Sequence, residues 1–447
     1  GRNQAVEMTI HEFLAPAAEA CQRTGPHDDI VMSSRVRLAR NLRKQPFPSW
    51  AKKPDRMRVL EAIQPAVEGL PQLAPHFTAA LDDLSPLDKQ ILVERHLISR
   101  EHAAKGAGSG FVVNQEESLC VMINEEDHLR MQALRPGLQL RQAWTAIDQL
   151  DSELERRLNF AFNSEWGYLT ACPTNLGTGI RVSAMLHLPG LVLAEQINPV
   201  IQSVNKLGLA VRGLYGEGTE ALGNVFQVSN QTTLGERESD LIDRLNKVIL
   251  QIIDHEENAR ITLLEKKPRL VYDQIGRAYG VLSNAHTVSS KEALNLLSLL
   301  RMGVDLELFP AGTRPIVDEL FMVAQPAHVQ KAAERKLTAE ARDRETLEAF
   351  ELALRLGATG LESDVWLTAD GEPVLDHDGV VRRRLGRSVP LAELRRADLP
   401  PHIPSLADLL EHCGTSIPLS LDLKDPAAGP RVLDVIESID QIGRAHV

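Results

Sequence analysis

The sequence predicts an α+β fold, because the segments with strand character cluster before the long helices instead of alternating with them. Val- and Ile-rich alternation over residues 111–124 predicts a pair of strands, and further strands separated by Gly-rich turns follow at 168–187, 209–215 and 225–229. A long amphipathic helix comes next, since apolar residues repeat at helical spacing on one stripe, namely Leu241, Leu245, Val248, Ile249 and Ile252.

The other elements follow from local signals of the same kind. A helix is expected to begin at Ser85-Pro86, with the serine as N-cap and the proline in the first turn, and to run to about His96. The remaining expectations are a strand at 29–41, helices at 138–162, 291–301 and 315–323, and, after a change of character near Arg344, a helix at 346–356 and strands at 360–367 and 371–375.

These elements suggest a division of the 447 residues into parts. We expect a lead-in over 1–27, a catalytic domain over 28–235, a helical C-terminal domain over 236–343, a second unit over 344–437 and a tail over 438–447. The last residues, 441–447, match what a common sequencing adapter encodes when translated. We therefore hypothesise that two unrelated genes are joined near Asp343 in a chimeric sequence, and a single product amplified across this junction from source DNA would refute that.

Composition limits the classes of function. The formal net charge of −12 argues against direct nucleic-acid binding, which needs a basic face to displace counterions. No run of about 18 apolar residues and no leader pattern occurs, so we expect a cytoplasmic location without membrane association. The four cysteines are far apart without a CxxC pair, which indicates neither a disulfide framework nor a structural metal.

Arginines alternate in the first expected strand. Arg35 and Arg37 are two residues apart, so on a strand both guanidinium groups lie on one face, as a phosphate clamp requires. A solvated basic strand edge is the alternative. The GxxxxGK[ST] pattern is absent from the chain, which argues against a P-loop nucleotide site.

Three acids follow the strand that ends near residue 124. Glu125, Glu126 and Asp127 stand together, with Arg130 close behind. Clustered carboxylates raise one another's pKa and suit proton abstraction or cation binding. An acidic loop or a helix N-terminus explains the same pattern equally well.

Two glycine-rich segments also carry charge. The first runs from Cys172 through Gly177 and Gly179 to Arg181, and its glycines permit close approach of the backbone to a ligand. The second covers residues 212–220, beginning with Arg212. It has the composition of a mobile charged loop.

These four segments, in this order, resemble the phosphagen kinase superfamily, and most closely its bacterial protein arginine kinase branch. The resemblance covers about residues 28–342 and includes Leu222-Gly223-Asn224-Val225-Phe226-Gln227-Val228-Ser229-Asn230. It implies an antiparallel sheet flanked by helices, followed by a helical C-terminal domain. It also implies transfer of the γ-phosphoryl group of ATP, with Mg²⁺, to arginine side chains of proteins.

The resemblance implies roles for individual residues. Those expected around the ATP phosphates and the transferred group are Ser34, Arg35, Arg37, His96, Arg130, Arg181 and Arg212. The resemblance implies that Glu126, helped by Glu125, is the base that takes a proton from the acceptor guanidinium. It implies that Glu217 holds the guanidinium from the other side. Cys172 is implied beside the substrate, with an inert buried thiol as the alternative. A guanidinium with a pKa above about 12 needs such acids to orient it and take its proton.

Three functions remain open at this point: a protein arginine kinase, a small-guanidino (phosphagen) kinase, and an inactive scaffold that binds phosphoarginine proteins. The 34 residues before Arg35 are fewer than the helical domain that encloses small substrates in creatine and arginine kinases, which favours a protein substrate. By resemblance, the partners are the Clp protease system and a stress-response repressor. The family's Arg-Asp-x-x-Arg-Ala motif begins at Arg342-Asp343 and then fails, which puts phosphoarginine sensing and homodimer contacts in doubt.

The second unit resembles glycerophosphodiester phosphodiesterases. The resemblance implies that Glu362 and Asp364 bind a divalent cation, that His377 is one of two catalytic histidines, and that Asp422 continues the pattern. An acidic strand end is the alternative for the two carboxylates. The family's opening His-Arg pair is missing and about three of eight barrel strands are present, so we expect an incomplete (β/α) barrel, an open parallel fragment, without phosphodiesterase activity.

Overall fold

The protein is described here by a computed structural model that covers residues 24–440, apart from 214–220, 232, 286–287, 311–312, 333–360, 377–378, 384–386, 401–402 and 414–418. One compact unit comprises the described residues of Gly1–Ile275 and Leu297–Val329. The second comprises those of Gly276–Leu296 and Gln330–Val447.

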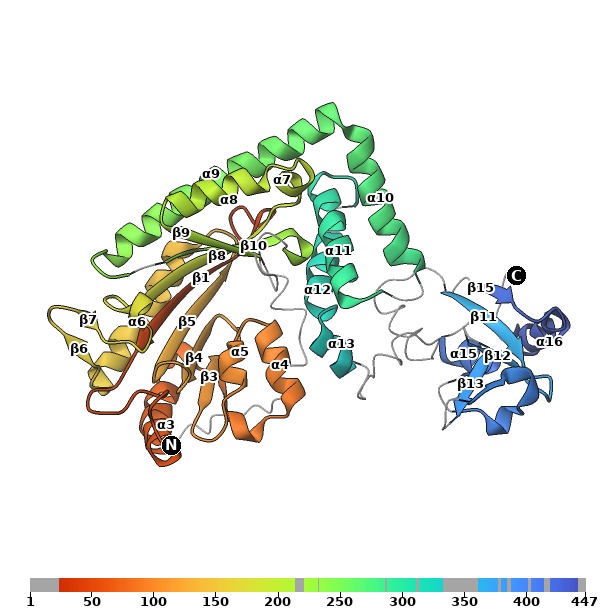
Figure 1. Ribbon diagram of the computed structural model, residues 1–447, viewed down its shortest axis with the longest axis horizontal. Coiled ribbons are helices and arrows are strands. Elements are labelled where there is room, and N and C mark those ends of the chain that lie inside the picture. The colour runs from red at the N-terminus through yellow and green to blue at the C-terminus, as the bar shows by residue number, and fades with distance from the viewer. Residues whose placement is uncertain are drawn as a thin grey trace. The chain divides into compact units, whose positions relative to one another are not determined.

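An eight-stranded antiparallel sheet forms the centre of the first unit, in the order β2-β3-β4-β5-β1-β8-β10-β9 (Figure 1). Its strands are β1 (Val31–Arg40), β2 (His76–Ala80), β3 (Gly110–Asn114), β4 (Leu119–Ile123), β5 (Leu129–Pro136), β8 (Ile180–His187), β9 (Leu209–Gly213) and β10 (Val225–Asn230). This confirms the predicted α+β class and the antiparallel sheet.

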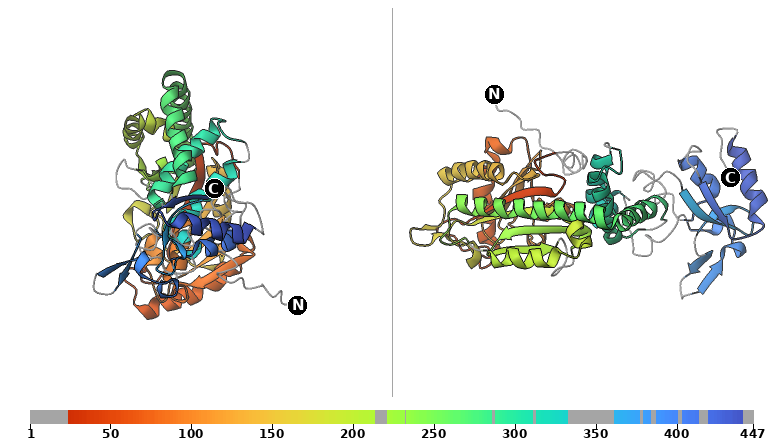
Figure 2. Two further views of the ribbon diagram at one scale, coloured as in Figure 1. Left: turned by 90° about the vertical axis from the view of Figure 1, so that its right-hand side faces the viewer. Right: turned by 90° about the horizontal axis from the view of Figure 1, so that it is seen from above.

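Helices cover one face of this sheet along its length. They are α3 (Lys53–Glu68), α6 (Leu140–Arg157), α7 (Pro189–Leu193), α8 (Ile197–Lys206) and α9 (Glu238–Lys266). The main core lies beneath them, and its fully buried residues include Val36 and Leu38 of β1, Ile147 of α6 and Ile249 of α9. Seen from above, α9 runs along the sheet, as its apolar stripe predicts (Figure 2).

On the opposite face, His187 at the end of β8 contacts Ser298 and Phe321 of the later helices, and another set of helices packs near β2–β4. There α4 (Pro86–Glu94) and α5 (Arg100–Ala103) pack on a second core that includes Phe111, Met122 and Leu92. The predicted N-cap is confirmed, because the Ser85 hydroxyl accepts a hydrogen bond from the Asp88 amide at 3.1 Å. The face over β1, β8, β10 and β9 is where the polar side chains gather.

Several predicted boundaries shift. The helix expected over 138–162 ends at Arg157, because the following residues turn back to pair with the end of β1 through a Leu42–Phe160 bridge. They then form the small hairpin of β6 (Phe162–Asn163) and β7 (Gly167–Tyr168).

The helices after α9 are α10 (Pro268–Asn284), α11 (Ser290–Asp305), α12 (Thr313–Val323) and α13 (Pro326–Ala332). The start of α13 is held by Glu94 of α4, whose carboxylate accepts the amide N–H groups of Ala327 at 2.8 Å and His328 at 3.2 Å. Among the described helices, none is long and apolar enough to cross a membrane.

The C-terminal part contains a three-stranded sheet in the order β12-β11-β15, built from β12 (Pro373–Leu375), β11 (Leu361–Leu367) and β15 (Leu419–Leu423). It also contains the hairpin of β13 (Val380–Arg383) and β14 (Arg387–Pro390) and the helices α15 (Leu406–Cys413) and α16 (Ala428–Asp440). The barrel is not closed, as expected. The expectation of an open parallel fragment is wrong for one pair, since β11 pairs with β15 in parallel but with β12 antiparallel.

Candidate functional site

Strand register brings five separated arginines to one face of the large sheet. Arg37 lies directly opposite Arg181, Arg130 lies opposite Ala39, and Arg212 lies opposite Gln227. Directly opposed residues of antiparallel strands point to the same side, and side chains alternate along each strand. Arg35, Arg37, Arg130, Arg181 and Arg212 therefore share the face not covered by α6 and α9, which we call the arginine face.

The reverse side of the same strands is apolar. Val36, Leu38 and Val182 alternate with the arginines and are fully buried in the main core. One face of the sheet thus supplies folding energy through burial while the other presents charge. This alternation is the local reason that the sequence places the arginines where it does.

The arginines perturb one another strongly. Burial and the charges of Arg130 and Arg181 lower the pKa of Arg35 to about 10. Burial, together with Arg35, Arg130 and Arg181, lowers the pKa of Arg37 well below its usual range. Burial, Arg212 and Arg130 lower the pKa of Arg181. Like charges this close favour a bound anion, which offsets their repulsion.

Some of the arginine nitrogens have protein partners and others do not. Arg35 donates from Nη2 to Gln227 Oε1 at 2.7 Å, and Arg181 donates from Nη2 to Ser229 Oγ at 3.1 Å. The Nε atoms of Arg37 and Arg181 are buried and have no hydrogen-bond partner among the described residues. Buried donors without partners are costly, so these two mark the place where ligand acceptors fit.

The acids beside the arginine face have different environments. Glu125 is 1% exposed, and its carboxylate accepts from Arg130 and from Ser99 Oγ at 2.6 Å each. Burial opposes ionisation of Glu125, but these contacts and the Glu126 amide hold its pKa at about 2. Glu126 is partly exposed to solvent, and partial burial of its carboxyl group, together with the charges of Asp127 and Glu125, raises its pKa. The two adjacent glutamates thus differ in chemistry: Glu125 stays ionised, whereas Glu126 is able to take a proton.

Asp127 connects the acidic loop to the segment with Cys172. Its carboxylate accepts from Asn41 Nδ2 at 2.5 Å and from the Ala171 amide at 2.7 Å, although burial raises its pKa. The sequence groups Asp127 with the neighbouring acids but does not predict this role or the part that Asn41 plays in it. No sequence signal pairs residues so far apart, since the contact depends on where β1 and β5 begin and end.

Cys172 is half-buried, and its Sγ lies 3.0 Å from Thr174 Oγ1. It is close enough to Arg181 to act on the pKa of that guanidinium. Cys120, by contrast, is 1% exposed, and burial raises its pKa. The surroundings of Cys172 therefore differ from those of an inert core thiol.

Ser34 and His96, which were also predicted to lie around the phosphates, have surroundings that differ from those of the five arginines. Ser34 faces away from them, is fully buried, and its hydroxyl donates to Gly137 O at 2.7 Å and accepts from the Gln139 amide at 2.9 Å. The alternation that places Arg35 on the arginine face puts Ser34 on the other. His96 is half-buried, and burial with the charge of Arg35 lowers its pKa to about 4, so the ring near Arg35 is neutral.

The expected role of the glycines changes as well. A Cβ on Gly179 would meet Ala39 O at 2.6 Å, and one on Gly177 would meet Leu234 Cα at 3.1 Å. Both have positive φ values, of 66° and 104°. They allow close approach of the chain to itself, where the sequence suggested approach to a ligand. Glu217 lies outside the described residues.

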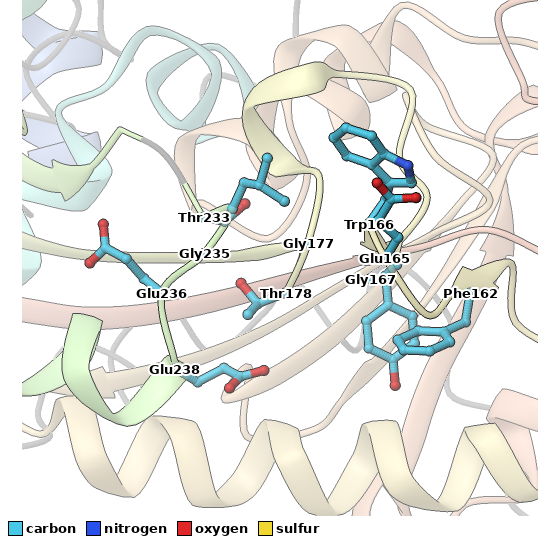
Figure 3. A pocket seen from close by; sticks show the side chains of 12 residues that line it. Phe162, Glu165, Trp166, Gly167, Gly177, Thr178, Thr233, Gly235, Glu236 and Glu238 are labelled. Carbon is cyan, nitrogen blue, oxygen red and sulfur yellow. The ribbon is translucent and has the colours of Figure 1, made fainter.

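A pocket with a volume of about 280 Å³ lies beside the β6–β7 hairpin (Figure 3). Aromatic rings and carboxylates come together in it, and its lining comprises Phe162, Glu165, Trp166, Gly167, Tyr168, Gly177, Thr178, Thr233, Leu234, Gly235, Glu236 and Glu238. No sequence signal marked this pocket, because its walls come from a hairpin, a loop and a helix start that are far apart in the chain.

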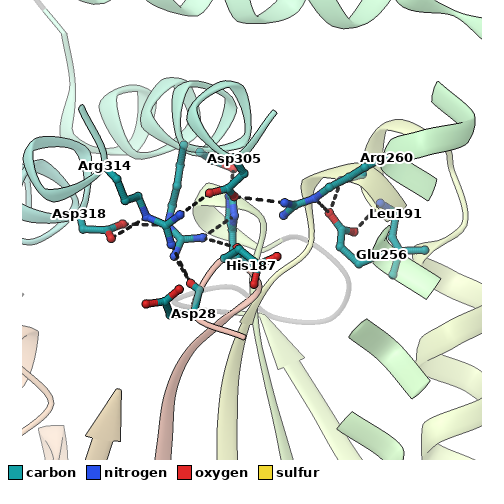
Figure 4. Close-up of polar contacts among 12 residues, drawn as sticks. Asp28, His187, Leu191, Glu256, Arg260, Asp305, Arg314 and Asp318 are labelled. Atoms are coloured by element: carbon teal, nitrogen blue, oxygen red, sulfur yellow. Dashed lines mark hydrogen bonds and ion pairs between the residues drawn. The ribbon is translucent and has the colours of Figure 1, made fainter. Parts of the chain in front are cut away.

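A buried ion network lies at the start of β1 (Figure 4). Arg301 donates to Asp28 O at 2.7 Å and to Asp318 at 2.8 Å, and Arg314 donates to Asp318 and Asp305. Arg260 continues it from Asp305 to Glu256, which accepts the amides that begin α7. The network ties α9, α11 and α12 to the sheet, which is a structural role.

In the C-terminal part, Lys424 Nζ lies 3.2 Å from Asp364 and 2.5 Å from Asp422. An ammonium group between these carboxylates takes the place that a cation would occupy. Within the described ranges, no group of three or more His, Cys, Asp and Glu side chains is arranged to hold a metal ion. His377 and the side chain of Glu362 lie outside the described residues.

Three family models match the chain. The ATP:guanido phosphotransferase C-terminal catalytic domain matches residues 58–259, and the protein-arginine kinase McsB C-terminal domain matches residues 268–356. The glycerophosphoryl diester phosphodiesterase family matches residues 332–419.

Curated relatives match most of the chain. It is 45% identical over 332 residues to the protein-arginine kinase of Halothermothrix orenii, which covers 74% of this chain and 95% of that protein. It is 47% identical over 325 residues to the protein-arginine kinase of Symbiobacterium thermophilum, covering 72% of this chain and 92% of that protein.

Solved structures match more weakly. A duplicated taurocyamine kinase from Schistosoma mansoni has a TM-score of 0.47 at 27% identity, over 55% of this chain and 35% of that chain. A glycerophosphodiester phosphodiesterase from Thermotoga maritima has a TM-score of 0.20 at 29% identity, over 22% of this chain and 45% of that chain.

Proposed function

The chain belongs to the protein-arginine kinase family and is an ATP-dependent phosphotransferase acting on arginine guanidinium groups, and on that premise we propose how its residues divide the reaction. Arg35, Arg37, Arg130, Arg181 and Arg212 bind the phosphates of ATP. The observation that carries this assignment is the pair of buried Nε atoms on Arg37 and Arg181, which have no hydrogen-bond partner in the part of the chain that the structure describes. Phosphoryl transfer depends mostly on positioning and charge stabilisation, which such a face supplies.

Glu126 is the base. Its raised pKa and its exposure suit a group that must meet the acceptor and accept a proton from it. The proton leaves a guanidinium nitrogen for Glu126, the nitrogen forms a bond to the γ-phosphorus, and the bond from that phosphorus to the β–γ bridging oxygen breaks to release ADP. Glu125 holds Arg130 in place through their ion pair. Glu217 provides a second grip on the guanidinium, and Cys172 borders it.

Mg²⁺ is proposed as the metal that reduces the charge on the ATP phosphates when bound. The described residues offer it no cluster of protein ligands, which is consistent with coordination through the nucleotide's own phosphates. His96 contributes a neutral ring beside Arg35 and adds no positive charge at neutral pH. Ser34 is not part of the proposed nucleotide site, because its hydroxyl makes hydrogen bonds with backbone groups on the other face of the sheet.

The acceptor is proposed to be arginine within proteins. The test is incubation with MgATP and an arginine-rich protein, beside free arginine as the competing small-guanidino substrate. Phosphoarginine on the protein is expected. Phosphate on free arginine alone would favour a small-molecule kinase, and binding of phosphorylated protein without transfer would favour a scaffold.

Further proposals rest on family resemblance. They are a cytoplasmic location, a role in the stress response and protein quality control, a Clp protease system and a stress-response repressor as partners, homodimer formation, and domain boundaries near residues 235 and 343. Co-purification from cells with tagged chain tests the partners, and sedimentation of the pure chain tests the dimer. The C-terminal fragment is proposed to be inactive, and release of glycerol phosphate from a glycerophosphodiester would contradict this.

A further inference from the structure

The pocket beside the β6–β7 hairpin is held in shape by contacts of Tyr168. The guanidinium of Arg40 lies 3.5 Å from the centroid of the Tyr168 ring and pairs with Asp151 at 2.6 Å. The Tyr168 hydroxyl donates to Glu155 at 3.1 Å, and its amide donates to Gly177 O at 2.8 Å. Tyr168 is therefore fixed from both ends, and it supports the hairpin that carries Phe162.

The chemistry of the lining suits a cation. Phe162 is 57% exposed and Trp166 is 46% exposed, which leaves two aromatic side chains open to a ligand. Glu236 pairs with Arg244 at 2.8 Å, whereas the carboxylates of Glu165 and Glu238 make no ion pair with any described residue. Aromatic faces together with free carboxylates are the surroundings in which an ammonium or guanidinium group binds best.

The pocket is connected to the acceptor side of the proposed active site. Its residues Gly177 and Thr178 belong to the segment that begins at Cys172 and continues into Arg181. Thr233 Oγ1 donates to Leu176 O at 2.6 Å, which joins the other wall to the same segment. The pocket and the proposed acceptor site thus share the segment 172–181 as a common wall.

We propose that this pocket binds a second Lys or Arg side chain of the protein substrate, close in sequence to the arginine that is phosphorylated. The proposal rests on the protein-arginine acceptor proposed above and names the substrate class more narrowly: arginines with a basic neighbour. Charge complementarity supports this occupant, and the size of about 280 Å³ admits one long side chain.

The test uses blocked peptides with one arginine. In one series lysine stands at successive distances from the arginine, and in a matched series norleucine replaces that lysine. At the best distance we expect kcat/KM for the lysine peptide to exceed that for the norleucine peptide by about tenfold, mainly through KM, as an ion pair with cation–π contact allows. Equal values for both series at every distance would overturn the proposal.

Variants of the lining residues test whether the preference for lysine arises in this pocket. The Glu165→Gln/Glu238→Gln double variant and Trp166→Leu should each reduce the preference for lysine to less than about twofold and leave the norleucine series unchanged. Glu257→Gln is the matched control, because Glu257 is an exposed carboxylate on the same helix as Glu238 but away from the pocket. A preference that survives in the double variant, or disappears in the control, contradicts the assignment.

A separate measurement distinguishes failure of the pocket from failure of the kinase proposal. A blocked lysine peptide without arginine is titrated into the wild-type chain and into Trp166→Phe, and tryptophan fluorescence is followed. We expect a saturable change that is lost in Trp166→Phe, and this needs no transfer. No saturable change in the wild type overturns the pocket, whereas binding without phosphorylation of any arginine peptide contradicts the proposed kinase activity alone.

Discussion

Arg37 of β1 and Arg181 of β8 lie directly opposite each other, and the Nε of each is buried without a hydrogen-bond partner among the described residues. Two guanidinium groups in this relationship repel, so the ligand-free fold is less stable than its apolar core would allow. A bound phosphate removes that repulsion. Stability and ligand binding are thus opposed at one place in the sheet.

The Arg37→Met variant should therefore be more stable than the wild type without ligand, by about 1 kcal/mol, because it removes one half-buried charge from a like-charged group. Arg130→Met should be less stable by about 3 kcal/mol, because it leaves the buried Glu125 carboxylate unpaired. Urea unfolding of both variants beside the wild type measures the difference. A loss of stability in Arg37→Met would show that the arginines do not repel as described.

Glu126→Gln should lower turnover by about 100-fold or more while nucleotide affinity stays within about twofold, because the amide keeps its shape but cannot take a proton. Glu257→Gln is the control, since Glu257 is an exposed carboxylate on α9, on the helical side of the sheet. Steady-state kinetics and nucleotide titration give the two values. Near-normal turnover in Glu126→Gln would remove the base assignment.

The catalytic rate should depend on pH in a defined direction. The pKa of Glu126 is raised above its usual 4.5, and the group must be ionised to accept a proton. The rate should therefore fall as pH falls through a value above 4.5, and Glu101→Gln should move this acid limb to lower pH by weakening the repulsion. A profile of kcat/KM against pH measures both. An acid limb unmoved by Glu101→Gln would point to another titrating group.

Asp127 is a positioning residue. Asp127→Ala removes the acceptor of the Asn41 and Ala171 hydrogen bonds, so the segment with Cys172 should shift and KM for the arginine substrate should rise by about tenfold. Nucleotide affinity should not change, because the arginines are held by the sheet. Both hydrogen bonds go to Oδ1, so Asp127→Asn, which keeps an acceptor oxygen there, should recover much of the loss. Equal KM in Asp127→Ala and wild type would contradict this.

Alternation in the sequence predicts which residues can share a face, but only register shows which ones meet. The pattern of Arg35 and Arg37 predicts a common face correctly, yet Ser34, in the same motif, points to the core. The opposition of Arg37 and Arg181 and the contact of Asp127 with Asn41 join segments far apart in the chain. Local patterns contain no information on such contacts.

Two helices, α3 and α10, are not predicted from the sequence, and the reasons are local. Helix α10 contains Gly276 and Gly280, which weaken a helical signal, and α3 contains Pro65, which usually ends a helix. Packing in the main core nevertheless buries Val59 and Ile63 of α3. Tertiary burial outweighed local preference there, and no single-segment pattern predicts that.

The arginine face is the proposed site of the ATP phosphates, on which the other assigned roles depend. Titration of MgATP into the wild-type chain, Arg37→Met and Arg181→Met measures this directly, with Arg141→Met as a control because Arg141 is an exposed arginine paired with Asp243 on the helical side. We expect each of the first two variants to bind MgATP at least about tenfold more weakly and the control to be unchanged. Unchanged affinity in both variants would contradict it.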